Sequence, residues 1–200
     1  MIELTDTSSR KVAAAAIYNL LAGCFTDNRE LMLDRARSLK KLLELLGMVA
    51  ELEHAEKIIE LLESDASATS EYVKLFDMGA APPYETAYTC RENPELKTYE
   101  MADIAGFYKA FNVKPRTERP DHIKTELEFM ALLLAKEALS APGSEEREVC
   151  REAKNRFYNE HIGRWTHELM LKIKTTASNP LYTYLTNLIT AIVSKRDLIE

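Results

Sequence analysis

The chain is poor in glycine, proline and cysteine, and each shortage excludes a class of protein. Six Gly and seven Pro in 200 residues are too few for the many tight turns of an all-β fold. The three cysteines, Cys24, Cys90 and Cys150, are an odd number and show no CxxC or Cys/His spacing. They therefore predict neither a disulfide framework nor a zinc site, and a reducing, cytoplasmic setting is the simplest interpretation.

An excess of positive charge, long apolar runs and common catalytic motifs are missing as well. A net charge of -6 and a pI near 5.4 argue against a protein that binds the phosphate backbone of nucleic acids. No run of 18 apolar residues is present, so we expect no membrane span. The patterns GxSxG, Walker A, GxGxxG and HExxH do not occur, so these signatures predict no catalytic residue and no metal site.

Leucine and alanine dominate what is present. They total 49 residues, against 17 for valine and isoleucine, and they lose little side-chain freedom in a helix. We therefore expect an all-α fold, a single globular helical domain over residues 1–200. Caps and apolar spacing predict about nine helices, near residues 8–25, 28–46, 48–64, 67–76, 94–111, 121–141, 144–163, 164–177 and 180–198.

Two irregular stretches separate these predicted helices. In residues 79–93, Pro82 and Pro83 require an extended backbone. Residues 112–120, NVKPRTERP, are polar and proline-containing, and they predict a hinge between possible subdomains 1–111 and 121–200. Exchange of the two halves through such a linker is a low-cost route to a dimer, so we expect a monomer or a domain-swapped dimer.

The segment 10–24, RKVAAAAIYNLLAGC, resembles a bacterial lipoprotein signal with Cys24 at the acceptor position. However, Glu3 and Asp6 make the preceding segment acidic, where such a signal is positive. Its apolar residues also recur at helical spacing. An ordinary amphipathic helix is therefore the favoured interpretation.

Two pairs of polar residues are candidates for chemistry. Glu51 and His54 form one ExxH on a predicted helix, but a di-iron site needs two such pairs, so a solvated helix face is favoured. Asp121 and His122 stand at a predicted helix start, where Asp121 can be the N-cap beside an exposed histidine. The alternative is a site for an anion or a backbone carbonyl, in which His122 reports pH near neutrality.

The densest group of aromatic and aliphatic side chains flanks the first irregular stretch. It consists of Tyr72, Leu75, Phe76, Tyr84 and Tyr88. Core packing alone explains such a group. The alternative is a groove for an apolar helix or peptide, in which the prolines form a rigid wall and the phenols offer polar contacts.

Four segments together resemble the TorD-like family of cytoplasmic chaperones for molybdoenzyme maturation. They are EYVKLF (71–76), PPYETAY (82–88), RPDHIKTELEFMALLLA (119–135) and FYNEHIGRWTHELM (157–170). They occur in the order and spacing of that family. The resemblance covers residues 12–195 approximately and implies an all-helical protein.

The resemblance implies a binding protein and not an enzyme. Such chaperones bind the N-terminal leader, often of the twin-arginine type, of a molybdenum-containing oxidoreductase subunit until its cofactor is inserted. The peptide-binding positions that carry over are Tyr72, Leu75, Phe76, Pro83, Tyr84, Glu85, Asp121 and His122. Tyr72 and Tyr84 stand where some relatives carry Trp, and Thr86 where Ser is usual, so the client is left open.

No cofactor is expected, apart from the weak GTP binding that the resemblance implies. A helical DNA-binding regulator and a nucleotide hydrolase or weak nucleotide-binding protein are the alternatives. Lys172 and Lys174 alone do not make a basic recognition face. The chain also has no phosphate loop.

Overall fold

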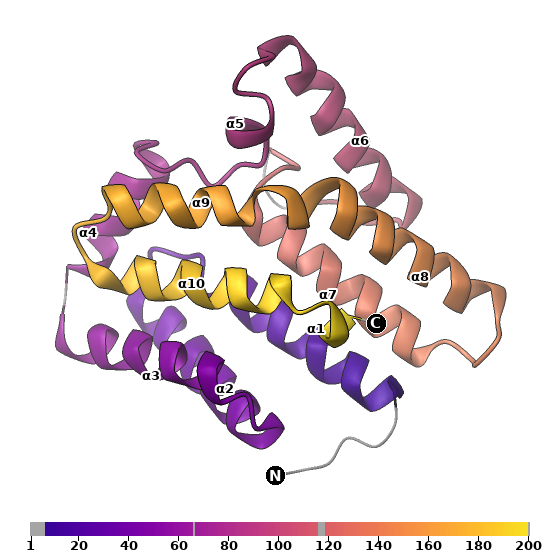
Figure 1. The fold of residues 1–200 in the computed structure, drawn as a ribbon, viewed down its shortest axis with the longest axis horizontal. Coiled ribbons are helices and arrows are strands. Elements are labelled where there is room, and N and C mark those ends of the chain that lie inside the picture. The colour runs from indigo at the N-terminus through magenta and orange to yellow at the C-terminus, as the bar shows by residue number, and fades with distance from the viewer. Residues whose placement is uncertain (1–6, 66, 116–118, 200) are drawn as a thin grey trace.

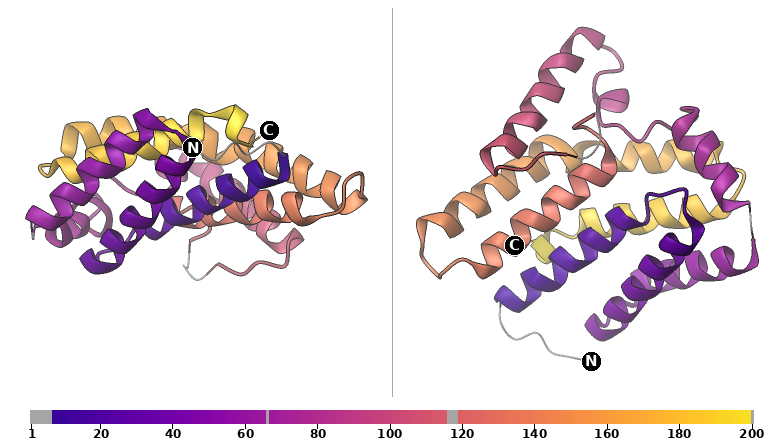
Figure 2. Two further views of the ribbon diagram at one scale, coloured as in Figure 1. Left: turned by 90° about the horizontal axis from the view of Figure 1, so that it is seen from below. Right: turned by 180° about the vertical axis from the view of Figure 1, so that it is seen from behind.

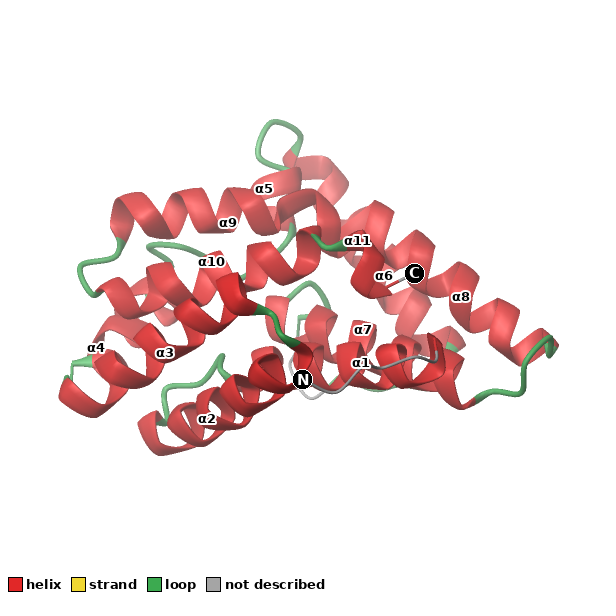
Figure 3. Ribbon diagram, turned by 60° about the horizontal axis from the view of Figure 1, so that its bottom comes forward, coloured by secondary structure: helices red, strands yellow, loops and turns green. Residues whose placement is uncertain are grey.

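Helices dominate the computed structural model, which describes residues 7–65, 67–115 and 119–199. The all-α prediction is confirmed, because these residues form no strand and only an isolated bridge between Tyr84 and His122 (Figure 3). The longer helices are α1 (Thr7–Gly23), α2 (Arg29–Leu46), α3 (Val49–Ser64), α6 (Lys97–Ala110), α7 (Ile123–Leu139), α8 (Glu145–Phe157), α9 (Gly163–Thr176) and α10 (Pro180–Ser194). The shorter ones are α4 (Ala68–Tyr72), α5 (Thr86–Thr89) and α11 (Arg196–Ile199).

The long helices form two layers around a shared apolar core. Helices α9 and α10 lie on one side, and α1 and α7 lie on the other (Figures 1 and 2). Helix α1 packs along α7, and α10 packs against both α3 and α9. Trp165, Tyr182 and Phe157 are among the largest side chains that this core encloses. Within the described ranges, every helix is too short or too polar to cross a bilayer.

Several predicted helix ends are confirmed. Asn28, Ser144 and Asn179 are N-caps, and the side chain of each accepts a backbone N–H from the first turn of its helix. Gly47 ends α2 with a φ of 68°, a left-handed conformation that favours glycine. Cys24 is buried directly after α1, in agreement with an amphipathic helix there. Glu3 and Asp6 lie outside the described residues.

The predicted boundary at residues 163–164 is wrong. Helix α8, the π-helical turn η3 (Tyr158–Ile162) and α9 form one continuous helical run. A Cβ atom on residue 163 would lie 2.6 Å from the carbonyl oxygen of Tyr158. Gly163 therefore permits the close approach of the π turn to the helix, and it does not end the helix.

Other elements differ from their predicted bounds. The helix expected at 67–76 divides into α4 and a π-helical turn, η1 (Val73–Asp77), and a 3-10 turn, η2 (Pro94–Leu96), precedes α6. The number of helices exceeds nine because α5 and α11 are separate, which gives eleven α-helical segments in the described ranges. Of the predicted hinge, residues 116–118 lie outside the described residues.

Candidate functional site

Two segments about 35 positions apart run antiparallel to each other at the start of α7, and we call residues 82–86 and 119–123 the crossing. Glu85 N–H donates to Asp121 O (2.9 Å), and Ile123 N–H donates to Pro83 O (2.9 Å). The two consecutive prolines keep this backbone extended, so that its carbonyl groups are available to the second segment. The crossing thus brings together five predicted site residues, which are Pro83, Tyr84, Glu85, Asp121 and His122.

Asp121 is fully buried in the crossing and is neutralised by its own chain. Arg119 donates Nη2 to Asp121 Oδ2 (2.6 Å) and Nε to Oδ1 (3.0 Å), and Thr86 Oγ1 donates to Oδ2 (2.6 Å). Burial raises the pKa of Asp121, but the hydrogen bonds from Arg119 and Thr86 outweigh it and hold the pKa below its usual range. The predicted N-cap at Asp121 is therefore wrong, because its carboxylate joins the two segments.

His122 is the N-cap of α7 instead. Its Nδ1 accepts the N–H of Lys124 (3.0 Å), which places the ring proton of the neutral form on Nε2. The ring stands edge-on to Tyr84, with centroids 5.3 Å apart. Burial, reinforced by the charge of Lys124, lowers the pKa of His122 to about 4. The prediction that His122 reports pH near neutrality is therefore wrong.

The predicted aromatic group exists, but much of it is core. Leu75, Phe76 and Pro83 are buried, whereas Tyr72 and Tyr84 are half-buried. The ring of Phe76 packs edge-on to Tyr72 at 4.9 Å between centroids. The π-helical turn η1 holds Leu75 and Phe76 in this position. These buried residues form the floor under the tyrosines and do not themselves line an open groove in this structure.

Two rings that were not predicted from the sequence connect this group. Phe25 contacts both Phe76 (5.5 Å) and His122 (6.4 Å), so it links the two ends of the group. Tyr182 packs against Phe76 at 5.5 Å. Tyr88, which we placed in the same group, instead stacks on Trp165 at 5.5 Å.

Three predicted residues reach the surface, and we call Tyr72, Tyr84 and His122 the tyrosine face. The guanidinium of Arg119 lies over the ring of Tyr84, 3.8 Å from its centroid, in a cation–π contact. In the turn that follows Tyr72 along the chain, Met78 is 78% exposed. Aromatic rings with phenol groups beside a guanidinium are suited to contact a peptide with apolar and polar side chains.

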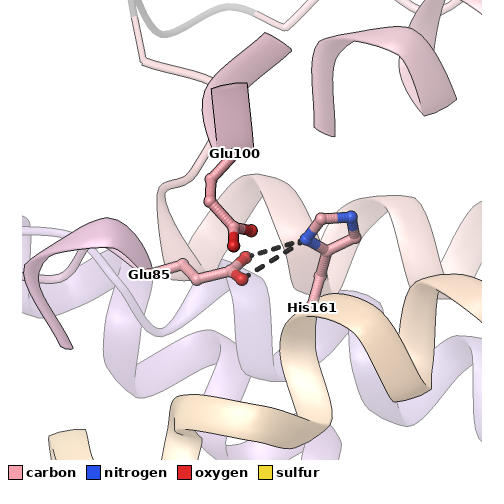
Figure 4. A group of neighbouring side chains, drawn as sticks. All are labelled: Glu85, Glu100 and His161. Carbon is pink, nitrogen blue, oxygen red and sulfur yellow. Dashed lines mark hydrogen bonds and ion pairs between the residues drawn. The ribbon is translucent and has the colours of Figure 1, made fainter. Parts of the chain in front are cut away.

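A buried ionic network next to the crossing was not predicted. Glu85, fully buried, lies against His161 on η3, with Nδ1 of the imidazole 3.2 and 3.3 Å from the two carboxylate oxygens (Figure 4). Arg164 lies 4.0 Å from Glu85 and 3.5 Å from Glu100. Glu85, one of the predicted peptide-binding residues, is thus engaged within its own chain.

Glu126 adds a second buried carboxyl group to this network. Trp165 Nε1 donates to Glu126 Oε2 (2.9 Å). Burial raises the pKa of Glu126 well above its usual range, and the nearby Glu85 carboxylate raises it further, so the neutral acid is favoured. A sequence signal was available, because Glu126 lies on the apolar face of α7 together with Ile123 and Met130.

The Glu51–His54 pair lies elsewhere. Glu51 is buried and pairs with Lys195 (3.1 Å), and His54 lies against Tyr184 with ring centroids 6.0 Å apart. The predicted solvated face is wrong, since Glu51 contributes to the contact between α3 and the C-terminal part of the chain. Neither residue belongs to a metal-binding group of donors within the described ranges.

Comparison with known proteins identifies a family and two relatives. The model of the family described as "Nitrate reductase delta subunit" matches residues 28–170. The selenate reductase assembly chaperone protein of Thauera selenatis is 28% identical over 113 residues, and the chlorate reductase assembly chaperone protein of Ideonella dechloratans is 28% identical over 111 residues. Each alignment covers 54% of this chain and 58% of the relative, so the match spans little more than half of either relative.

Proposed function

The chain belongs to the nitrate reductase delta subunit family, and from this premise we propose that it is an assembly chaperone for a molybdenum-containing oxidoreductase. The observation that carries the proposal is the family match over residues 28–170, which includes the crossing and the tyrosine face. The two relatives described above are both named assembly chaperone proteins. The proposed role is binding without catalysis.

The proposed partner is the apo form of a molybdoenzyme catalytic subunit, bound in the cytoplasm through its N-terminal leader. A leader of the twin-arginine type carries an apolar segment beside basic residues. While the chaperone covers this leader, the subunit stays away from the export machinery until its cofactor has been inserted.

The apolar segment of the leader would bind across the tyrosine face. Tyr72 and Tyr84 offer ring surface and phenol groups, and the buried Leu75, Phe76 and Pro83 hold these rings in place. Each Å² of apolar surface removed from water contributes about 25 cal/mol before ordering costs. Rigid aromatic residues keep these ordering costs low, which is why such residues are frequent binding hot spots.

The basic residues of the leader would bind at Asp121. The net charge of -6 favours the approach of a basic peptide. Arg119 already occupies this position, because its guanidinium is bonded to Asp121 and stacked on Tyr84. The Arg119 side chain is 33% exposed and the Asp121 side chain is fully buried, so an incoming guanidinium would reach Asp121 only by displacing Arg119. We expect a leader arginine to compete with Arg119 for Asp121.

The test is to purify the tagged chain from its host after anaerobic growth and to identify co-purifying proteins by mass spectrometry. We expect one molybdoenzyme catalytic subunit, which is lost when the N-terminal leader of that subunit is deleted. Recovery of no such subunit, while candidate clients are demonstrably expressed, would contradict the proposal. The family membership would then describe the fold alone.

Two expectations accompany this function. Weak GTP binding is to be measured by equilibrium dialysis, and no step of the proposed binding mechanism depends on it. The protein is expected to be a monomer or a dimer that swaps halves through residues 112–120. Light scattering that shows only monomer at high concentration would count against swapping.

A further inference from the structure

Three side chains that the proposed function does not use meet at the edge of the molecule. They are Asp103 of α6 and Glu160 and His161 of η3, and one donor atom from each lies within 4.8 Å of the others. A cavity of about 330 Å³ adjoins them, lined also by Leu96 and Tyr99. The group therefore connects α6 to the long helix that contains η3.

The orientation of His161 is the observation that points to a ligand. The imidazole is 1% exposed, and its Nδ1 faces the Glu85 carboxylate, so the neutral ring carries its proton on Nδ1 and a lone pair on Nε2. Figure 4 shows Nε2 directed away from Glu85 and Glu100. In the part of the chain that the structure describes, this buried Nε2 has no hydrogen-bond partner.

The groups around Nε2 of His161 favour a cation between them. Nε2 of His161 lies 3.3 Å from Oδ2 of Asp103, so a lone pair and a carboxylate oxygen face each other. Two acceptors at this distance repel each other unless a proton or a metal ion lies between them. A proton gives an imidazolium between two carboxylates, whereas a metal ion also recruits the neighbouring Glu160.

We propose that Asp103, Glu160 and His161 bind a divalent transition-metal ion of the zinc type. One imidazole and two carboxylates are a ligand set that Zn²⁺ accepts, with water in the remaining position. Glu85 holds the distal nitrogen of the ligating histidine, which is the carboxylate–histidine–metal arrangement that fixes the ring and raises its basicity. The site is independent of the proposed chaperone function.

Charged neighbours set the conditions for binding. Arg156 pairs with Glu160 (3.0 Å), and both side chains of this pair are exposed, so a metal ion can replace Arg156 at little cost. Arg164 pairs with Glu100 (3.5 Å) and leaves Asp103 accessible, since Asp103 is 58% exposed. A bound ion would tie α6 to η3, and we expect slower amide exchange in residues 97–110 when the metal is present.

The test uses the full chain without a histidine tag and titrates it with Zn²⁺ by calorimetry. We expect one Zn²⁺ per chain, and binding weaker by at least about tenfold in both Asp103→Asn and Glu160→Gln. Glu152→Gln is the matched control, because it removes one exposed negative charge from α8 outside the three donors, and we expect it to change the affinity less than about twofold.

Cobalt provides a readout that identifies the ligands. Co²⁺ bound by one imidazole and carboxylates shows visible d–d bands without thiolate charge transfer, which excludes the three buried cysteines as ligands. Both variants are at partly exposed positions, so loss of folding does not obscure the result. No stoichiometric Zn²⁺ binding, equal binding by Asp103→Asn, or a thiolate–cobalt spectrum would each overturn the proposal.

Discussion

Two buried glutamates on α7 have the same side chain, but their surroundings shift its pKa in opposite directions. Glu126 lies in the first turn and Glu137 in the last turn, eleven residues or about three turns apart on one face. Both are fully enclosed by protein. Their surroundings nevertheless favour opposite protonation states.

Glu137 lies in a cluster with an excess of base, because three basic side chains share its one carboxylate. Lys11 donates to Oε1, Lys154 donates to Oε2 (2.7 Å), and Arg151 donates to Oε1 (3.2 Å). Burial raises the pKa of Glu137, but the hydrogen bonds from Lys11 and Lys154 outweigh it and hold the pKa below its usual range. Lys154 also donates to the carbonyl of Ile199, so this cluster joins α1, α7, α8 and α11.

Glu126 lies in a cluster with an excess of acid. Its neighbours are the carboxylate of Glu85, to which the neutral acid can donate a hydrogen bond, and the indole of Trp165. Buried groups with strongly shifted pKa values concentrate at functional sites. The basic cluster around Glu137 thus acts as a structural connection, whereas the acidic cluster lies next to the crossing that we assign to client binding.

Removing the charge of Glu137 breaks the basic cluster and has the largest expected effect on stability. Glu137→Gln leaves two buried lysines without their anion and should lower the free energy of unfolding by about 3–5 kcal/mol. Urea unfolding measures this loss. Glu148→Gln, which removes the exposed partner of Arg151, is the control and should cost less than about 1 kcal/mol. An equally small effect of both substitutions would show that the cluster does not contribute to the free energy of unfolding.

The tyrosine face should affect client binding and leave stability nearly unchanged. Tyr84→Ala removes a half-buried ring and should weaken leader binding by about 1 kcal/mol or more, measured by calorimetry with a leader peptide. Phe76→Ala should weaken binding as well, but its ring is 4% exposed, so it should also cost about 3–5 kcal/mol of folding free energy. Unchanged affinity in both variants would remove the tyrosine face from the proposed site.

Glu126→Gln should be the mild counterpart of Glu137→Gln. Burial and the Glu85 carboxylate shift Glu126 toward the neutral acid, which an amide resembles, so the expected cost is below about 1 kcal/mol by urea unfolding. A loss as large as that of Glu137→Gln would show that Glu126 is ionised. The comparison between the two ends of α7 would then fail.

The contributions of Glu126 and Glu137 to the free energy of unfolding should depend on pH with opposite sign. The raised pKa of Glu126 gives stability that is complete below the unfolded pKa, about 4.3, and is lost as the pH rises through the folded value. The lowered pKa of Glu137 gives stability that is present above about 4.3 and is lost as the pH falls through the folded value. Unfolding curves of wild type and both variants across pH 3–9 check this, and parallel curves would contradict it.

The smallest expected effect is that of His122 on the pH dependence of leader affinity. Its pKa of about 4 keeps the ring neutral, so leader affinity should be the same at about pH 6 and pH 8 as far as His122 is concerned. His122→Asn preserves an N-cap and is the matched variant. A change of affinity between these pH values that disappears in His122→Asn would show that the histidine titrates in this range.

The sequence was sufficient for the fold class, for several helix caps and for the family, whose resemblance the comparisons confirm. Helical periodicity and capping are local properties, so the helix starts near residues 144 and 180 were predicted correctly. The boundary at Gly163 was wrong because glycine can either end a helix or permit a close backbone contact within it. Only the position of Tyr158 O in the folded chain shows that Gly163 does the second.

The site was predicted only in part, because several of its contacts join residues that are far apart in the sequence. The position of Asp121 just before a helix predicted an N-cap. In the structure its carboxylate instead accepts a hydrogen bond from Thr86, 35 positions away. Likewise, nothing local indicates that Glu85 and His161, 76 positions apart, meet in the interior. Long-range ion pairs of this kind depend on the packing of whole helices, which the periodicity of a single helix does not report.

Leader binding at the crossing and the tyrosine face can be tested by hydrogen–deuterium exchange of the full chain with and without the apo catalytic subunit of its client. We expect slower exchange in residues 72–88 and 119–124, and no change when the subunit lacks its N-terminal leader. Protection confined to α2 and α3, or equal protection by the subunit without its leader, would contradict the proposed binding site.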